Sequence, residues 1–367
     1  MRLINVKTLE LEGFIVDDAP PYAILSHTWG DDEVTYQDWQ DQSKAAEMAG
    51  YAKIKAAIEQ TIVNELKYLW VDTNCIDKSS SAELSEAINS MFLWYQRAKV
   101  CFVYLADIEI ASEDAVERRA GAYMFESLKA SRWFYRGWTL QELLAPKYLE
   151  FFSKDWQSIA CLNRSRKNPS DEAGHLLHLV DDISKITGIR KRYLWDNVSY
   201  KSASIADRMY WASSRLTFRT EDKAYCLLGI FNINMPLLYG EGRRAFQRLQ
   251  EEIIKISTDQ SIFAWEWLDP VKKRDNEDLS ILAPWPSAFT NRNISRWPQD
   301  VQNDPLDSIY TLSNFGLSLR LPIWQTTSSG TSFAVLDCMD LRCVGNNAAY
   351  SRKEYLKELP RRPIPST

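Results

Sequence analysis

The sequence predicts an α/β protein in which a parallel sheet carries helices on both faces, followed by a helical extension and a small β-rich region. Three observations support this fold class. Up to about residue 155, short runs of β-forming residues alternate with segments whose apolar residues recur at helical spacing. From about 205 to 257 the spacing is helical throughout. After 260, short β-like runs are separated by proline and glycine.

The alternating part is expected to form a parallel sheet of about five strands between residues 20 and 155. The first strand, YAILSH, follows a double proline, and the helix that begins SAELSEAINS starts with serines, which cap helices well. The clearest strands are expected at 22–27, 67–77, 99–107 and 147–152, and the helices between them at 45–66, 81–98 and 116–131.

Domain boundaries are expected where the pattern changes. The polar stretch NRSRKNPSDEAG is a candidate linker after the alternating part. We therefore expect an α/β domain at 1–165, a helical extension packed on it at 166–260, and a β-rich C-terminal region at 261–367.

Composition restricts the classes of function. The formal net charge of -5 argues against a general nucleic-acid binder, which needs a basic surface. The six cysteines are scattered and mostly lie in apolar runs, as is typical of reduced thiols in a cytoplasmic protein. No apolar run approaches the length of a membrane span, and no metal site is expected. We therefore expect a cytoplasmic protein with no nucleic-acid partner and no membrane span.

The carboxyl ends of the first two strands are the expected ligand-binding edge of the sheet. The polar segments there are SHTWGDDE and DTNCIDKSSS, which contain neither spaced dinucleotide-binding glycines nor a P-loop. His27 is either a substrate contact or a hydrogen-bonding brace for its loop. Trp29 either stacks on a flat ligand or plugs the sheet edge, and Gly30 would allow a close backbone approach. Asp72 either contacts ligand or caps its loop.

One carboxylate, Glu142, lies in the unusually aromatic stretch SRWFYRGWTLQELLAP. Trp138 is four residues earlier, so the two side chains would share a helix face. A carboxylate beside an indole, partly shielded from water, could hold ribose hydroxyls or stabilise an oxocarbenium-like state. The alternative interpretation is a solvated glutamate on the wet side of a short helix.

Three blocks resemble the fungal heterokaryon-incompatibility (HET) domain over roughly residues 22 to 155. They are PPYAILSHTWGDDEVTYQDW, the stretch from YLWVDTNCIDKSSS to KVCFVYLAD, and SRWFYRGWTLQELLAP. The run from ADRMYWASSRLTF to AFQRLQEEI resembles the extension that commonly follows this domain. This resemblance implies a role in programmed cell death triggered by non-self recognition.

The same order of motifs is similar, more distantly, to the Toll/interleukin-receptor (TIR) domain, which implies a flavodoxin-like sheet. In enzymatic TIR domains a glutamate four residues after a tryptophan cleaves NAD, and by position these are Glu142 and Trp138. The segment 108–130 departs from the usual TIR spacing. The resemblance implies an NAD glycohydrolase with Glu142 as the catalytic residue. The substrate-binding residues would be Ser26, His27, Trp29, Gly30, Asp72, Cys75, Asp77 and Trp138.

Three kinds of function therefore stay open, and in the weakest of them the protein is a scaffold whose C-terminal β region recognises a partner. The other two place the function in the α/β domain. In the first, the α/β domain is an enzyme that takes NAD or a related nucleotide as substrate and needs no cofactor. In the second, it is a non-catalytic TIR-like module that self-associates in death signalling, with Glu142 structural. Both imply a homo-oligomer on activation and are compatible with a receptor for non-self as a partner.

Overall fold

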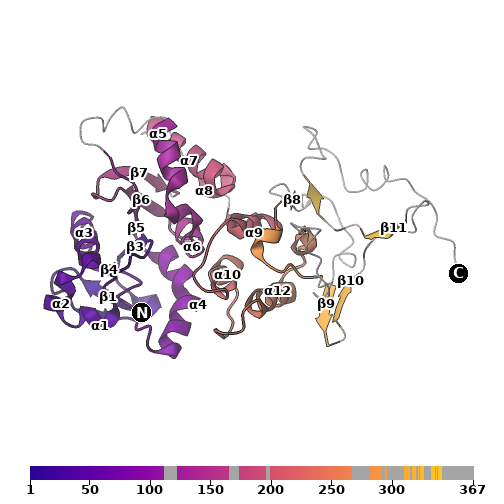
Figure 1. The fold of residues 1–367 in the computed structure, drawn as a ribbon, viewed down its shortest axis with the longest axis horizontal. Helices are drawn as coiled ribbons and strands as arrows, with labels where there is room; N and C mark the ends of the chain where they lie inside the picture. The colour runs from indigo at the N-terminus through magenta and orange to yellow at the C-terminus, as the bar shows by residue number, and fades with distance from the viewer. Residues whose placement is uncertain are drawn as a thin grey trace. The chain divides into compact units, whose positions relative to one another are not determined.

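The computed structural model describes residues 1–110, 122–164, 173–195, 199–266 and 281–290, with short stretches between 294 and 340 (Figure 1). The chain forms two compact units. The first contains Met1–Tyr200 and Ser214–Phe246, and the second contains Lys201–Ser213 and Gln247–Thr367.

The first unit is built on a seven-stranded sheet with the order β2-β1-β4-β3-β5-β6-β7. Its four central strands are parallel: β4 (Tyr68–Trp70), β3 (Ala23–His27), β5 (Val100–Tyr104) and β6 (Tyr148–Phe152). This mixed α/β architecture confirms the predicted fold class. Among the described residues between 20 and 155 there are four parallel strands, where about five were expected.

Three further strands extend the sheet at its edges, and all three run antiparallel to their neighbours. They are β1 (Arg2–Asn5) and β2 (Leu11–Gly13), which form a hairpin beside β4, and β7 (Ser158–Asn163), which pairs with β6. The sequence analysis did not predict them, because pairing at a sheet edge depends on the strand beside it and not on the local pattern.

Helices cover both faces of the sheet. The chain passes from β3 through α3 (Ala49–Val63) to β4, and then through α4 (Ser81–Arg97) back across β3 to β5. Because the two crossovers run in opposite directions and such connections are right-handed, α3 and α4 lie on opposite faces. Every residue of β3 is buried, as expected for a central strand covered on both sides.

Further helices complete the first unit. The single helix expected at 45–66 is two helices, α2 (Gln42–Glu47) and α3, separated at Met48, and α1 (Tyr36–Trp39) precedes them. The others along this part of the chain are α5 (Ala122–Ala130), α6 (Thr139–Leu144), α7 (Ala173–Thr187) and α8 (Lys191–Leu194). Residues 116–121 of the expected helix at 116–131 lie outside the described residues.

The segment Ser214–Phe246 belongs to the same unit as the sheet. It contains α10 (Asp222–Tyr225) and α11 (Leu228–Phe231), and their apolar residues are buried as the sequence predicted. Helix α11 packs directly on α4, because a Cβ added at Gly229 would lie only 2.1 Å from the Cβ of Phe92. The downstream segment is therefore part of the body that carries the sheet.

The second unit combines helices with short pairs of antiparallel strands. Its helices are α9 (Ile205–Ser213) and most of α12 (Arg244–Ile256). Its described strands pair antiparallel: β9 (Tyr310–Ser313) with β10 (Gly316–Leu319), β11 (Ile323–Gln325) with β12 (Ser332–Ala334), and β8 (Ile294–Ser295) with β13 (Met339–Asp340). These strands confirm that the C-terminal region contains β structure, and residues 341–367 lie outside the described residues.

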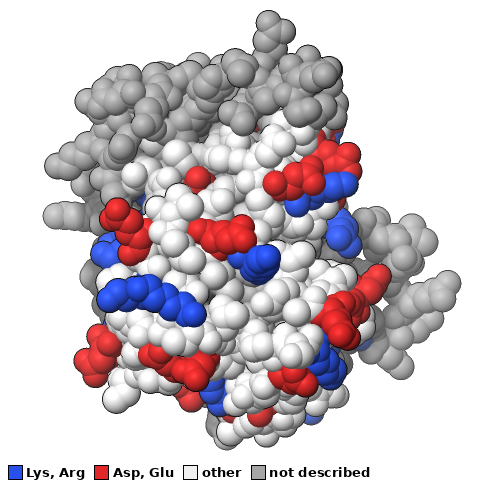
Figure 2. All heavy atoms as spheres, turned by 90° about the vertical axis from the view of Figure 1, so that its left-hand side faces the viewer, with Lys and Arg blue, Asp and Glu red and all other residues white. Residues whose placement is uncertain are grey.

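Two general features bear on function. Among the described residues, no helix combines the length and hydropathy needed to cross a membrane. On the face of the molecule drawn in Figure 2, acidic and basic side chains are interspersed among uncharged ones.

Candidate functional site

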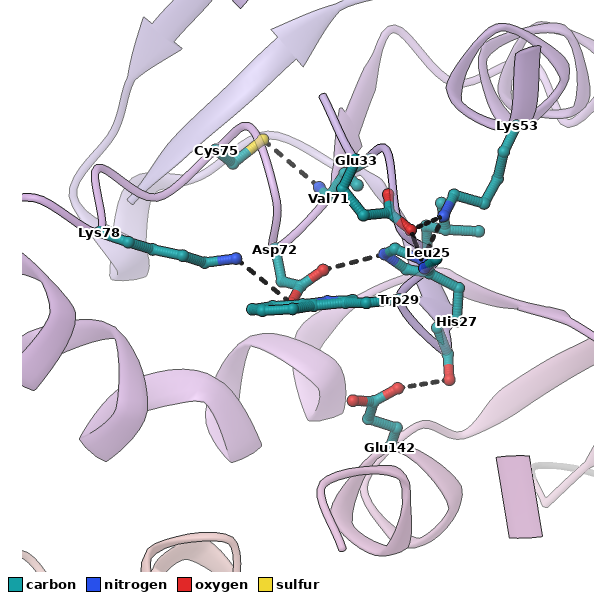
Figure 3. A network of polar contacts seen from close by, with 12 residues as sticks. Leu25, His27, Trp29, Glu33, Lys53, Val71, Asp72, Cys75, Lys78 and Glu142 are labelled. Atoms are coloured by element: carbon teal, nitrogen blue, oxygen red, sulfur yellow. Dashed lines mark hydrogen bonds and ion pairs between the residues drawn. The ribbon is translucent and has the colours of Figure 1, made fainter. Parts of the chain in front are cut away.

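The candidate site lies where β3 ends, beside the loop after β4 and the short helix α6. In the order β4-β3-β5, the chain leaves β3 toward β4 on one side and later returns to β5 on the other side, so the strand order reverses at β3. In sheets of this kind ligands bind at such a point, beyond the carboxyl ends of the strands. Figure 3 shows the polar side chains that gather here, from β3, from the loops after β3 and β4, from α3 and from α6.

Glu142 is buried, with only 7% of its surface exposed. Its Oε2 accepts a hydrogen bond of 2.5 Å from the hydroxyl of Ser26, and that hydroxyl accepts one of 2.8 Å from Nε1 of Trp133. Burial raises the pKa of Glu142 to about 8, although the hydrogen bonds from Ser26 and Tyr95 act to lower it. The solvated helix glutamate considered from the sequence is therefore wrong, because α6 is buried along its whole length.

A second network links charges from three elements through His27. Nζ of Lys53 lies 2.6 Å from Oε1 of Glu33 and 2.7 Å from Nδ1 of His27, and Nε2 of His27 lies 3.0 Å from Oδ1 of Asp72. An ammonium can only donate, so Nδ1 of His27 must accept and Nε2–H donates to Asp72. Both ring nitrogens of His27 therefore have partners within the protein, as the loop-bracing interpretation expects, and a substrate contact of His27 stays a prediction.

Asp72 accepts hydrogen bonds from two of the predicted site residues. Besides His27, Nε1 of Trp29 donates to its Oδ2 over 2.9 Å. Burial acts to raise the pKa of Asp72, but the charge of Lys78 and the hydrogen bond from His27 outweigh it and hold this pKa below its usual range. Asp72 is thus an ionised anchor that fixes His27 and Trp29 in place.

Trp29 is the most exposed aromatic side chain of the site, at 40%. Nζ of Lys78 lies 3.7 Å from the centre of its ring, and the guanidinium carbon of Arg136 lies 5.7 Å from it. The ring therefore forms cation–π contacts with two basic side chains. A flat ligand can stack on it only where these cations leave the ring open.

The remaining predicted residues have other surroundings. Cys75 is buried and its sulfur accepts a hydrogen bond from the backbone N–H of Val71, and burial raises its pKa to about 12. Asp77 accepts hydrogen bonds from Gln37 and Ser79 and so shapes the loop before α4. Trp138 forms a hydrogen bond with Asp222, in the downstream segment, and not with the residues around Glu142.

Gly30 is not required by the backbone of its loop. A Cβ added there would meet only Oε1 of Glu33, at an ordinary contact distance of 3.7 Å. By contrast, a Cβ at Gly137 would lie 2.5 Å from Cγ2 of Thr217, so the chain just before α6 approaches the downstream segment closely. The backbone N–H of Gly137 donates to the carbonyl of Leu216 over 2.8 Å, which fixes the start of α6.

Four contributors to the site were missed from the sequence: Glu33, Lys53, Tyr95 and Arg136. Lys53 is 26 residues from His27 and lies on α3, and no motif marks it. The helical pattern of α3 could have been used to place Lys53 opposite the end of β3. Arg136 was quoted within the aromatic stretch, but its position over Trp29 depends on the packing of α6.

The arrangement suits stabilisation of a positive charge next to Glu142. A buried carboxyl with a raised pKa ionises when a cation is brought beside it, because the cation offsets the cost of burial. Within the described residues, no group of three or more His, Cys, Asp or Glu side chains is placed to hold a metal ion.

Comparisons with known proteins identify two regions. Residues 22–124 match the family described as Heterokaryon incompatibility protein (HET), and residues 244–329 match a domain of unknown function, DUF8212. The chain is 44% identical over 239 residues to the vegetative incompatibility protein HET-E-1 of Podospora anserina.

That alignment covers 64% of this chain but only 16% of the relative. No solved structure shows significant similarity to the chain. The family match contains β3, β4 and β5 with the networks around His27 and Asp72, and it ends before α6. Residues 22–124 therefore form a heterokaryon-incompatibility (HET) domain by this match, and the aligned part of the chain is homologous to HET-E-1.

Proposed function

We propose that this protein acts in vegetative incompatibility as an NAD glycohydrolase, and that cleavage of the nicotinamide–ribose bond triggers cell death. The observation that carries the proposal is the burial of Glu142 against Ser26, at the ligand-binding edge of a flavodoxin-like sheet. The name of the relative from Podospora anserina supports the biological role, and the distant similarity to enzymatic TIR domains supports the reaction.

The reaction needs one carboxylate. The bond between C1′ of ribose and the pyridinium nitrogen breaks, and its electron pair neutralises the nicotinamide. The ribose is left as an oxocarbenium ion, to which water adds with release of a proton. Because nicotinamide leaves as a neutral molecule, no general acid is required, whereas ordinary glycosidases use two carboxyl groups.

Glu142 would stabilise this cation. In the free protein its carboxyl holds a proton at neutral pH, because its pKa is raised to about 8. Substrate brings a positively charged pyridinium ring, which favours the ionised form of Glu142. Ser26, itself held by Trp133, keeps the carboxylate in one orientation through its hydrogen bond. Such preorganisation is the usual source of electrostatic catalysis.

The test is to incubate the purified chain with NAD and to measure free nicotinamide by chromatography. The chain is assayed both dilute and clustered through a fused oligomerisation domain, because TIR-like enzymes often work only as assemblies. We expect nicotinamide and ADP-ribose in equal amounts from the clustered chain. Unchanged NAD, NADP and ATP after incubation with the clustered chain would refute the proposed activity.

A second candidate function is self-association without catalysis, and one surface feature favours it. Leu216 and Phe218 are large apolar side chains that are 71% and 93% exposed. Their loop is joined to the residues before α6 by two backbone hydrogen bonds between Leu216 and the pair Tyr135 and Gly137. Contact with a second copy would remove these apolar side chains from water. Replacing Phe218 with aspartate would abolish assembly measured by light scattering if this loop forms the contact.

A further inference from the structure

Two basic side chains flank one exposed aromatic ring at the edge of the sheet. Lys78 and Arg136 come from different parts of the chain, the loop after β4 and the segment before α6, and both contact Trp29. The indole is held in place because its N–H donates to Asp72. The loop after β4 thus presents Lys78 beside a fixed and partly exposed surface, as Figure 3 shows.

Arg136 has no anionic partner within the part of the chain that the structure describes. Its guanidinium makes the cation–π contact with Trp29 and acts electrostatically on the carboxyl of Glu142, but it forms no ion pair within 4.0 Å with a described carboxylate. It is nevertheless partly buried. A guanidinium shielded from water is stabilised by an anion that accepts its parallel N–H donors. Arg136 is therefore available to a bound anion.

Lys78 shares its anionic partner with other donors. Its Nζ lies 3.9 Å from Oδ2 of Asp72, and Asp72 already accepts hydrogen bonds from His27 and Trp29. Counting the whole site, three cations (Lys53, Lys78 and Arg136) face the carboxylates of Glu33 and Asp72, while Glu142 holds a proton at neutral pH. Before substrate binds, the site therefore carries one excess positive charge, which lies with Lys78 and Arg136.

We propose that Lys78 and Arg136 bind the diphosphate group of a nucleotide beside Trp29. The inference rests on the proposed function, since it names how the substrate cleaved at Glu142 is held. The acceptor oxygens of a diphosphate suit the planar fork of arginine and the point charge of lysine. The site would therefore select substrates with a diphosphate over the same nucleoside without one.

Isothermal titration of inorganic pyrophosphate into the full chain tests binding without any turnover. Arg136→Gln and Lys78→Gln should each raise the dissociation constant for pyrophosphate at least tenfold. Arg136→Lys should raise it less than Arg136→Gln does. The control is Arg97→Gln. Arg97 is the last residue of α4, just before β5 begins, and so lies near the amino ends of the parallel strands. It is paired there with Asp17. The Arg97→Gln variant should bind pyrophosphate with the same dissociation constant as the parent.

Pyrophosphate that fails to bind the parent, or binds all four variants equally, would overturn the inference. A second measurement separates it from the proposed function. If NAD is cleaved, kcat/KM for NAD should exceed that for nicotinamide riboside at least tenfold, and Arg136→Gln should remove this preference mainly through KM. Cleavage of both substrates at equal efficiency would refute the diphosphate site but not the glycohydrolase activity. If pyrophosphate binding depends on Arg136 and Lys78 but NAD is not cleaved, the diphosphate site is supported and the glycohydrolase activity is refuted.

Discussion

Replacing Glu142 with glutamine should make the protein more stable at alkaline pH than the parent. The pKa of this carboxyl rises from 4.5 when exposed to about 8 in the fold, chiefly through burial. Below pH 4.5 both the folded and unfolded states hold the proton. Between 4.5 and 8 only the folded state holds it, so the free energy of unfolding falls as the pH rises, by ~1.36 kcal/mol per pH unit.

Over the whole window the loss is on the order of 5 kcal/mol. Glutamine keeps an oxygen to accept from Ser26 but carries no charge, so it does not share this loss. The difference in unfolding free energy, variant minus parent, should therefore grow by several kcal/mol between pH 5 and pH 9. Other titrating groups are common to both proteins and cancel. Alanine is a poorer probe, since it leaves the Ser26 hydroxyl without its acceptor.

The assay is denaturant unfolding of both proteins at half-unit pH steps. Each step gives the midpoint and slope, and the unfolding free energy follows from them. A difference that stays constant within about 1 kcal/mol from pH 5 to pH 9 would refute the reasoning, because it would mean that Glu142 ionises freely in the fold.

Three other predictions follow from local packing. Gly229→Ala should destabilise the protein by about 1–3 kcal/mol, because its Cβ would lie 2.1 Å from the Cβ of Phe92; an unchanged melting temperature would contradict the packing of α11 on α4. Gly30→Ala should melt like the parent, since its Cβ has ordinary space, and a large loss of stability in calorimetry would count against this. Cys75 should resist iodoacetamide in the native protein at pH 8 and react only after unfolding, as followed by mass spectrometry, because it is buried and its pKa is raised to about 12. Rapid native labelling of Cys75 would show that the loop after β4 opens.

The central strands were predictable because each is a continuous buried run. The strand expected at 22–27 is β3 (Ala23–His27), and the helix expected at 81–98 is α4, with Ser80 accepting from the N–H of Glu83 at its start. Such elements combine local propensity with burial, so their pattern is visible in the sequence. The edge strands β1, β2 and β7 could not be predicted in this way, because their pairing also depends on the neighbouring strands of the sheet.

The site could be predicted in part. The sequence placed His27 and Asp72 at the same edge, because parallel strands end together, and their side chains are hydrogen bonded. The sequence could not decide whether Glu142 is exposed to solvent or buried. Its burial depends on Ser26, 116 residues earlier in the chain, and on the packing of α6. Spacing also suggested that Trp138 and Glu142 act together, whereas Trp138 is bonded to Asp222. Helical spacing fixes a face, but tertiary packing decides what that face meets.

The rate of nicotinamide release by the clustered Glu142→Gln protein, compared with the clustered parent, tests the central claim most directly. Glutamine preserves the shape of the side chain and removes only the charge that would stabilise the ribosyl cation. We expect the parent to release nicotinamide from NAD and the variant, folded and clustered to the same extent, to be slower by ~100-fold or more. Equal rates in the two proteins would contradict the assignment of Glu142 as the catalytic carboxylate.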